Sequence, residues 1–302
     1  MSLSASQNHT IQPIDWVLIL LLSVIWGGSF FFIKIALADF QPLTIVWGRV
    51  TIAAILLTIW VYLSGQKMPR SAQLWREFSV MGLLNNLIPF CLIVWAETQI
   101  DSSLAAIVNA TTPIFTVILA NFLTQDEKLT LNRSIGIGLG ICGVVVLVGF
   151  SVLRGLSLHD LGQFASLAAS FSYGCASVYG RRFKTVPSLV TAAGTVTTAS
   201  LLLLPIAFWV EKPWTVQPRL SAVAALIVLG LVCTGVAYFL YFSILGRVGA
   251  TYVSLVTFLV PISALLLGIL ILGERLALNS IVGMALIFAG LAAIDGRFFR
   301  KA

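Results

Sequence analysis

Ten long apolar runs, separated by short breaks of polar or turn-forming residues, dominate this sequence. A helix needs about 20 apolar residues to cross the hydrocarbon core of a bilayer, and long apolar runs must be helical there to satisfy their backbone groups. Only 10% of the 302 residues are charged, against roughly 25% in a soluble domain. The sequence therefore predicts an all-α membrane protein with ten transmembrane helices. The predicted spans are residues 16–37, 43–64, 74–96, 102–123, 134–152, 161–179, 189–210, 220–242, 250–272 and 280–294.

Lys and Arg residues are unevenly divided between the two sets of connecting loops. One set holds about 12 of them and the other about 5, and the richer side is the cytoplasmic one. That side includes the C-terminus, and ten spans bring the N-terminus back to it. We therefore expect a multi-pass protein of a bacterial inner membrane, with a cytoplasmic N-terminal segment (1–15) and a basic cytoplasmic tail (297–302). The net charge of +7 then reflects topology, and nucleic acid is not expected as a partner.

The second half of the chain repeats the first. The stretch that begins at residue 82 reappears from residue 230, and each copy ends on Glu-x-Leu-x-Leu-Asn, at 127–132 and 274–279. Each half holds five predicted spans, and an odd number makes the second half enter the membrane from the opposite side. Such inverted repeats are typical of secondary transporters, which bind substrate near the midplane between the halves.

The two repeats are expected at residues 16–152 and 153–296, around a central cavity. The last span of each repeat is punctuated by glycines, which allow close helix approach. We interpret these two spans as a scaffold or a dimer contact, and the pattern allows a homodimer without requiring one. The glycines concerned are Gly136 and Gly143 in the first repeat and Gly283 and Gly290 in the second.

These motifs give the chain a clear resemblance to a known family. It resembles the EamA-type branch of the drug/metabolite transporter superfamily, through residues 26–30 (Trp-Gly-Gly-Ser-Phe), Pro113, Pro261 and the two Glu-x-Leu elements. The resemblance covers nearly the whole chain and is greatest to the YddG-type exporters of aromatic and other neutral amino acids. It implies that spans one, three, four, six, eight and nine surround the cavity, and that the protein exports its substrate.

Polar and aromatic side chains recur at helical spacing along these spans. In lipid such side chains turn toward the bundle interior or a wet cavity. Two alternatives stay open: small polar residues also hold helices together, and Trp or Tyr near a span end, Trp95 for example, also forms interfacial belts. The candidate substrate-binding residues are Trp26, Phe30, Asn85, Asn86, Trp95, Asn109, Thr112, Tyr173, Tyr238, Tyr241 and Thr257.

Three prolines fall inside predicted spans. Pro89, Pro113 and Pro261 each remove an intrahelical hydrogen bond and can kink the helix. We interpret them as hinges or as static kinks that shape the cavity.

The predicted spans contain no Asp or Glu near their middle, and Glu97 falls at an outer end. Lys34 and Arg49 lie within about two turns of an outer end, and we expect both to snorkel to the interface. An uncharged cavity favours a neutral or zwitterionic metabolite with an aromatic or apolar part, moved by alternating access without obligatory ion coupling. A proton-coupled exporter of the same fold is the alternative.

An intramembrane enzyme is the alternative from another class. The two histidines, His9 and His159, lie outside the predicted spans, so a membrane-embedded Ser–His dyad is not available. The cysteines and histidines also lack metal-ligand spacing. The sequence therefore predicts a transporter, not an enzyme, with a small-molecule substrate, lipid around it, and no metal or cofactor.

Overall fold

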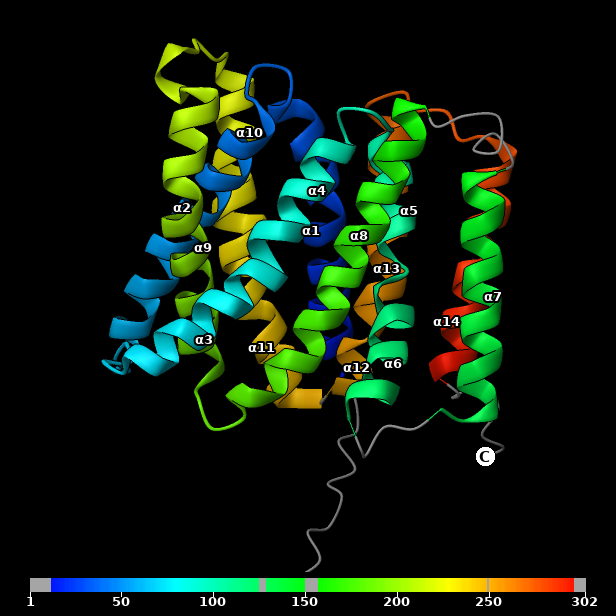
Figure 1. The fold of residues 1–302 in the computed structure, drawn as a ribbon, viewed down its shortest axis with the longest axis horizontal. Coiled ribbons are helices and arrows are strands. Elements are labelled where there is room, and N and C mark those ends of the chain that lie inside the picture. Colours follow the sequence, from blue (N-terminus) through cyan, green and yellow to red (C-terminus); the bar gives the residue numbers. More distant parts are fainter. Residues whose placement is uncertain (1–11, 125–128, 150–156, 249, 296–302) are drawn as a thin grey trace, which may run out of the picture.

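The computed structural model describes residues 12–124, 129–149, 157–248 and 250–295. The predicted tail (297–302), most of the predicted N-terminal segment and Glu127 lie outside these residues. Within them, all regular structure is helical and no strand occurs. Figure 1 shows the helices running side by side as one bundle.

The first half contains five helical units, two of them interrupted. They are α1 (Pro13–Ala36), α2 (Pro42–Leu63), α3 (Ala72–Gly82) joined by a π-helical turn (Leu83–Leu87) to α4 (Ile88–Ala96), α5 (Ser102–Asn109) followed by α6 (Thr112–Leu123), and α7 (Leu131–Val148).

The second half has the same order of units. They are α8 (Leu158–Tyr179), α9 (Ser188–Glu211), α10 (Leu220–Gly230) joined by a π-helical turn (Leu231–Val236) to α11 (Ala237–Val248), α12 (Ala250–Val253) followed by α13 (Leu255–Leu270), and α14 (Leu278–Asp295). Short 3₁₀ turns follow α8 (Gly180–Phe183) and α9 (Pro213–Thr215).

Eight of these units are long and apolar enough to cross a membrane. The other two predicted spans correspond to α13, a shorter apolar helix, and to α8, whose 22 residues suffice in length but include more polar side chains. The predicted fold class, an all-α membrane protein, is confirmed.

Local sequence explains where several helices begin and end. Pro13 and Pro42 occupy the first position of α1 and α2, where proline's missing N–H costs no hydrogen bond. Ser157 caps α8 by accepting a hydrogen bond from the backbone N–H of Asp160, and its hydroxyl donates to the Asp160 carboxylate. Gly149 ends α7 with a φ of 76°, a conformation that glycine adopts without strain.

The helix contacts follow the inverted repeat. α2 packs on α9 and α7 on α14, which are the second and fifth units of each half. Two further contacts correspond between the halves: α1 with α13 matches α8 with α6, and α1 with α11 matches α8 with α4. Exchanging the halves therefore reproduces these main contacts, as expected for two copies of one five-helix unit.

The glycine-rich helices α7 and α14 pack closely against each other. They stand together at one edge of the bundle (Figure 1). A Cβ on Gly136 would lie 2.5 Å from the carbonyl oxygen of Gly290. This confirms the close approach predicted for the two spans, and the contact is made within one chain.

The two π-helical turns occupy equivalent places in the repeats. They begin at Leu83 and Leu231, directly after the residues at which the sequence repeat was recognised. A π turn holds one extra residue and is frequent at functional sites. Both turns face the interior between the halves, where they carry Asn86 and Thr234, each at most 2% exposed.

Candidate functional site

Two asparagines from one repeat meet a tyrosine from the other inside the bundle. Asn85 Nδ2 donates to the Tyr238 hydroxyl oxygen at 2.9 Å, and the Tyr238 hydroxyl donates to Asn86 Oδ1 at 3.0 Å. Asn86 is fully buried, and its Nδ2 has no hydrogen-bond partner among the described residues. The π turn at 83–87 directs both asparagines inward. The structure thus brings together three of the predicted residues, Asn85, Asn86 and Tyr238.

Arg49 extends this cluster, which we call the central polar site: Arg49, Asn85, Asn86, Thr234 and Tyr238. Arg49 Nε donates to Thr234 Oγ1 at 2.8 Å. Its guanidinium carbon also lies 3.9 Å from the centre of the Phe90 ring, within cation–π range. Only 6% of Arg49 is exposed. The expected snorkelling of Arg49 is therefore wrong, because the side chain turns into the bundle, where hydroxyl and aromatic groups receive it.

Aromatic rings border the central polar site. Trp26 and Tyr241 have ring centroids 5.7 Å apart, and Phe242 contacts both Tyr241 and Tyr238, with centroids 5.2 and 6.1 Å away. Tyr173 of α8 lies near Arg49 and Tyr238. Rings from α1, α8 and α11 thus supply apolar area beside the polar groups.

The remaining candidates lie elsewhere. Phe30 is 5% exposed and belongs to the main hydrophobic core. Asn109 accepts from the Ser170 hydroxyl, and the Thr112 hydroxyl donates to the Asn109 carbonyl at 2.8 Å. Asn109 therefore links the α5–α6 break to α8, and Thr112 stabilises the break itself. Thr257 makes no side-chain hydrogen bond to the described residues, and Trp95 is 37% exposed, as an interfacial residue would be.

The three prolines act differently on their helices. Pro89 lies at the second position of α4, two residues after the end of the π turn, and Pro113 follows the break between α5 and α6. Pro261 lies inside α13, which continues past it. Two of the predicted kink positions thus coincide with interruptions of the helix, whereas the third does not.

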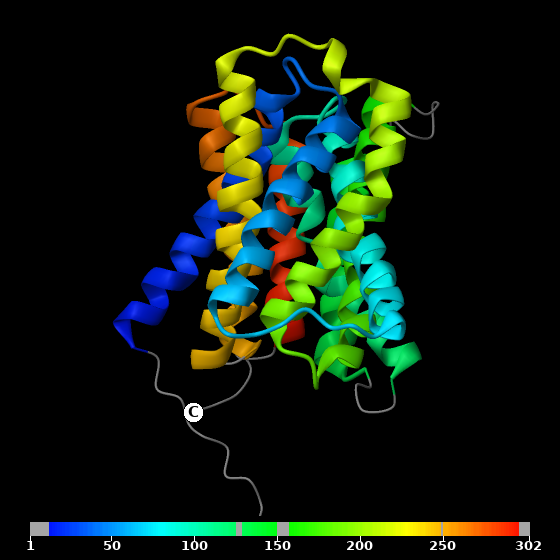
Figure 2. The same ribbon diagram turned by 90° about the vertical axis from the view of Figure 1, so that its left-hand side faces the viewer.

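A second group of charges lies near the end of the bundle that holds the connections 37–41, 97–101, 212–219 and 271–277, the upper end in Figures 1 and 2. Lys34 Nζ donates to the carbonyls of Glu97 and Ile100 at 2.8 and 3.0 Å. Glu97 is 1% exposed, and neither carboxylate oxygen has a hydrogen-bond partner in the described structure. Burial raises the pKa of Glu97 well above its usual value, and the nearby Lys34 opposes this.

Carboxylates of the second repeat cap helices of the first at the upper end. Glu211 accepts from the backbone N–H groups of Leu43 and Thr44 at 2.9 and 2.6 Å, at the start of α2. Glu274 accepts from the backbone N–H groups of Ser102 and Ser103 at 2.9 and 3.0 Å, at the start of α5. Negative charge is favourable at a helix N-terminus, so these contacts are stabilising. Because each carboxylate and the helix it caps belong to different halves, the contacts also join the halves.

An exposed ion pair adds to this closure. Asp39 accepts from Arg219 Nη2 at 2.9 Å and from the Arg219 backbone N–H at 2.9 Å. The hydrogen bond from the Arg219 side chain holds the pKa of Asp39 below its usual value. The upper end is thus tied across the halves at three separate places.

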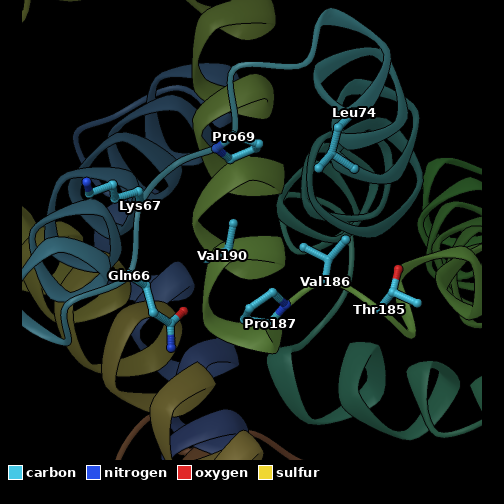
Figure 3. Close-up of a pocket in the computed structure, with 8 residues that line it drawn as sticks. All are labelled: Gln66, Lys67, Pro69, Leu74, Thr185, Val186, Pro187 and Val190. Carbon is cyan, nitrogen blue, oxygen red and sulfur yellow. The ribbon is translucent and has the colours of Figure 1, made fainter.

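A groove opens at the opposite, lower end. Its volume is about 380 Å³, and its walls come from the α2–α3 and α8–α9 connections (Figure 3). It includes none of the predicted substrate-binding residues. The lining residues are Gln66, Lys67, Pro69, Leu74, Thr185, Val186, Pro187 and Val190.

The sequence interpretation missed that Arg49 and Glu97 are buried. The resemblance placed span two outside the cavity, and Arg49 and Glu97 were placed by their distance from span ends. A signal was present: an ionisable residue within an apolar span is by default a functional candidate, because its burial is costly. The expectation of an uncharged interior is therefore corrected at Arg49, whose buried guanidinium lies between the halves, whereas Glu97 is buried at the upper end of the bundle, where the sequence placed it.

Two inverted helical halves with polar groups from both at their interface define the architecture of a secondary transporter. The chain belongs to the EamA-like transporter family, whose sequence model matches residues 15–149 and 160–294. It is a multi-pass membrane transporter of that drug/metabolite family, built from two copies of the family's unit.

Known proteins are similar over nearly the full chain. The uncharacterized transporter YoaV of Bacillus subtilis (strain 168) is 26% identical, over 94% of this chain and 97% of its own. A protein of Escherichia coli (strain K12) described as a probable amino-acid metabolite efflux pump is 30% identical, over 95% and 97%. The uncharacterized inner membrane transporter YedA of the same strain is 29% identical, over 85% and 82%.

A solved crystal structure shares the fold. It has a TM-score of 0.67 and 21% sequence identity, and the likeness covers 93% of this chain and 97% of that one.

Proposed function

We propose that this protein exports small neutral or zwitterionic metabolites, aromatic and other amino acids among them, across a bacterial inner membrane. Both chain ends then lie in the cytoplasm. The substrate class is supported by the name of the relative described as an amino-acid metabolite efflux pump. The YddG-type exporters remain the subgroup to which we assign the chain.

One observation carries the proposal: the central polar site joins the two halves. Asn85 and Asn86 belong to the first repeat and Tyr238 to the second, and their hydrogen bonds cross the interface. Beside them, Trp26 and Tyr241 offer aromatic area. Ligand sites of this kind pair apolar walls with a few placed polar groups, which suits an amino acid with an aromatic or apolar side chain.

Alternating access is the mechanism we propose. The repeats 16–152 and 153–296 rock against each other around the central polar site, with Pro89, Pro113 and Pro261 as bends in the moving helices. The contacts of Glu211, Glu274 and Asp39 close the upper end, which is the extracellular end in the proposed orientation. Opening to that side requires these contacts to break.

The test is counterflow in proteoliposomes. Proteoliposomes that contain the purified protein are loaded with an unlabelled amino acid, and entry of the same amino acid in labelled form is measured. The amino acids tested include phenylalanine and threonine. We expect transient accumulation for at least one member, absent in protein-free liposomes. A panel without any accumulation would contradict the assigned substrate class.

A specific observation favours a second candidate, a proton-coupled exporter of the same fold. Glu97 is buried with both carboxylate oxygens unpartnered within the described chain, and such groups serve as proton carriers in transporters. Flux with and without an imposed pH gradient separates the candidates. Transport of a neutral substrate that depends strongly on the gradient would replace the uncoupled mechanism by this one.

Labelling of introduced cysteines separates a carrier from a channel. Asn109→Cys and Thr257→Cys are placed in the two halves, at equivalent spans. A carrier exposes each position to an impermeant reagent from one side at a time. Simultaneous labelling from both sides would identify a channel.

A further inference from the structure

Arg49 is a buried cation without a hydrogen-bonded counter-ion. It follows Pro42, the first residue of α2, by about two turns, or roughly 10 Å along the helix. Its Nε donates to Thr234, and the Phe90 ring covers one face of the guanidinium. Its two terminal nitrogens make no hydrogen bond to any residue that the structure describes.

The protein does not neutralise this charge by an ion pair. The ionisable groups near Arg49 are Cys233, Tyr173, Tyr238 and Glu97. Glu97 is the carboxylic acid among these four, and its buried oxygens hydrogen-bond to nothing in the described part of the chain. A buried charge held in this way is costly unless a partner reaches it.

The geometry leaves one side of the guanidinium ready for a ligand. Thr234, whose hydroxyl also donates to the Leu229 carbonyl at 2.9 Å, fixes Nε within the π turn at 231–236. The stacked ring fixes the plane, so the terminal nitrogens remain as a planar fork. That fork matches the two oxygens of a carboxylate.

A second unsatisfied donor lies in the same cluster. Asn86 Nδ2 is buried and unpartnered, while the Asn86 side-chain oxygen is held by Tyr238. A guanidinium and an amide N–H both require an acceptor, and a carboxylate is an acceptor with two oxygens. The unpaired donors of Arg49 and Asn86 thus both fit a carboxylate as acceptor.

We propose that Arg49 binds the carboxylate of the transported molecule, which makes it the residue that selects carboxylate-bearing substrates. This inference rests on the proposed function and narrows its substrate class. Amides and esters of the same compounds lack the negative charge that would pair with the guanidinium and are disfavoured.

A purely structural role for Arg49, tying α2 to the π turn through Thr234, is the competing explanation. It predicts that loss of Arg49 weakens all ligands equally. Carboxylate binding predicts that the loss is confined to ligands with a carboxylate. The comparison of an acid with its amide therefore separates the two roles.

The experiment measures counterflow of labelled phenylalanine in proteoliposomes, with competition by unlabelled phenylalanine or by phenylalaninamide. In the wild type, phenylalanine should compete roughly tenfold or more better than the amide. Arg49→Gln should remove this preference and leave competition by the amide unchanged. Arg70→Gln, at an exposed loop position, is the matched control and should behave as the wild type.

Three results would overturn the assignment. The first is equal competition by acid and amide in the wild type, a comparison that needs no variant to fold. The second is an Arg49→Gln protein that keeps the preference. The third is an equal loss for both ligands in Arg49→Gln. Absence of counterflow for every amino acid in wild-type protein would instead refute the proposed function itself.

Discussion

Gly143 and Gly283 meet backbone to backbone, so that a Cβ on either would lie 2.8 Å from the carbonyl oxygen of the other. This contact, between α7 and α14, leaves no room for a side chain at either position. It makes the pair of terminal helices a fixed frame beside the helices that carry the central polar site.

We expect Gly143→Ala to destabilise the protein by about 1–3 kcal/mol, the usual cost of overpacking. The methyl group would meet the Gly283 carbonyl and the Ile287 side chain, which belong to one rigid helix. The matched control is Gly138→Ala, because nothing lies within 4 Å of a Cβ there. Thermal melting in detergent measures both, and equal melting temperatures for the two variants would contradict the prediction.

Tyr238→Phe should destabilise the protein by about 1–3 kcal/mol, because a buried acceptor is left unpaired. The lost hydroxyl is the partner of Asn86 Oδ1, and Asn86 is fully buried. Transport should fall as well, since the hydroxyl joins the two halves. Tyr62→Phe is the control, because Tyr62 is 58% exposed. A fully stable Tyr238→Phe protein would show that the network contributes little.

Glu274→Gln should lower the melting temperature in a pH-dependent way. Burial raises the pKa of Glu274, but its hydrogen bonds from Ser103 and Ser102 lower it more, so the net pKa lies below the usual 4.5. A depressed pKa gives stability that is complete above about pH 4.5 and is lost as pH falls through the folded value.

The difference in melting temperature between wild type and Glu274→Gln should therefore be constant from about pH 8 to about pH 5 and shrink at lower pH. Glu77→Gln serves as the control, since Glu77 makes only a long exposed hydrogen bond to Gln73, at 3.4 Å. A difference that grows on acidification would have the wrong sign for a helix-capping carboxylate.

Asp39→Asn should leave stability nearly unchanged. Its partner Arg219 has a side chain that is 68% exposed, and exposed ion pairs gain little over their interactions with water. Chemical or thermal unfolding that shows a loss comparable to that of Gly143→Ala would contradict this prediction.

The broad architecture could be predicted because lipid imposes strong rules on sequence. Length and hydropathy located the spans, and the repeat from residue 82 and residue 230 predicted the inverted halves. The close approach of α7 and α14 followed from glycines such as Gly136 and Gly290. Pro89 and Pro113 indicated two interruptions, but the π turns themselves could not be predicted, because a π turn at 83–87 has the same composition as a continuous apolar helix.

The central polar site was only partly predictable. Asn85, Asn86 and Tyr238 were recognised because amides and hydroxyls in apolar spans need partners. Arg49 was assigned to the interface, since its side chain is long enough to reach water or to turn inward, and packing decides between the two. Phe90 and Thr234, which receive the guanidinium, come from other spans, so their proximity is a property of the fold.

The two π turns determine which side chains of their helices face the interior, because they change the rotation of the following residues about the helix axis. Each residue of an α-helix advances the chain by about 100° around its axis, and the extra residue in Leu83–Leu87 shifts everything after it by that angle. Loss of a single codon there would leave a long apolar helix intact in length and composition. It would nevertheless swing Phe90 and Glu97 away from the halves' shared interior, so a transmembrane segment with unchanged hydropathy would present a different face to its substrate.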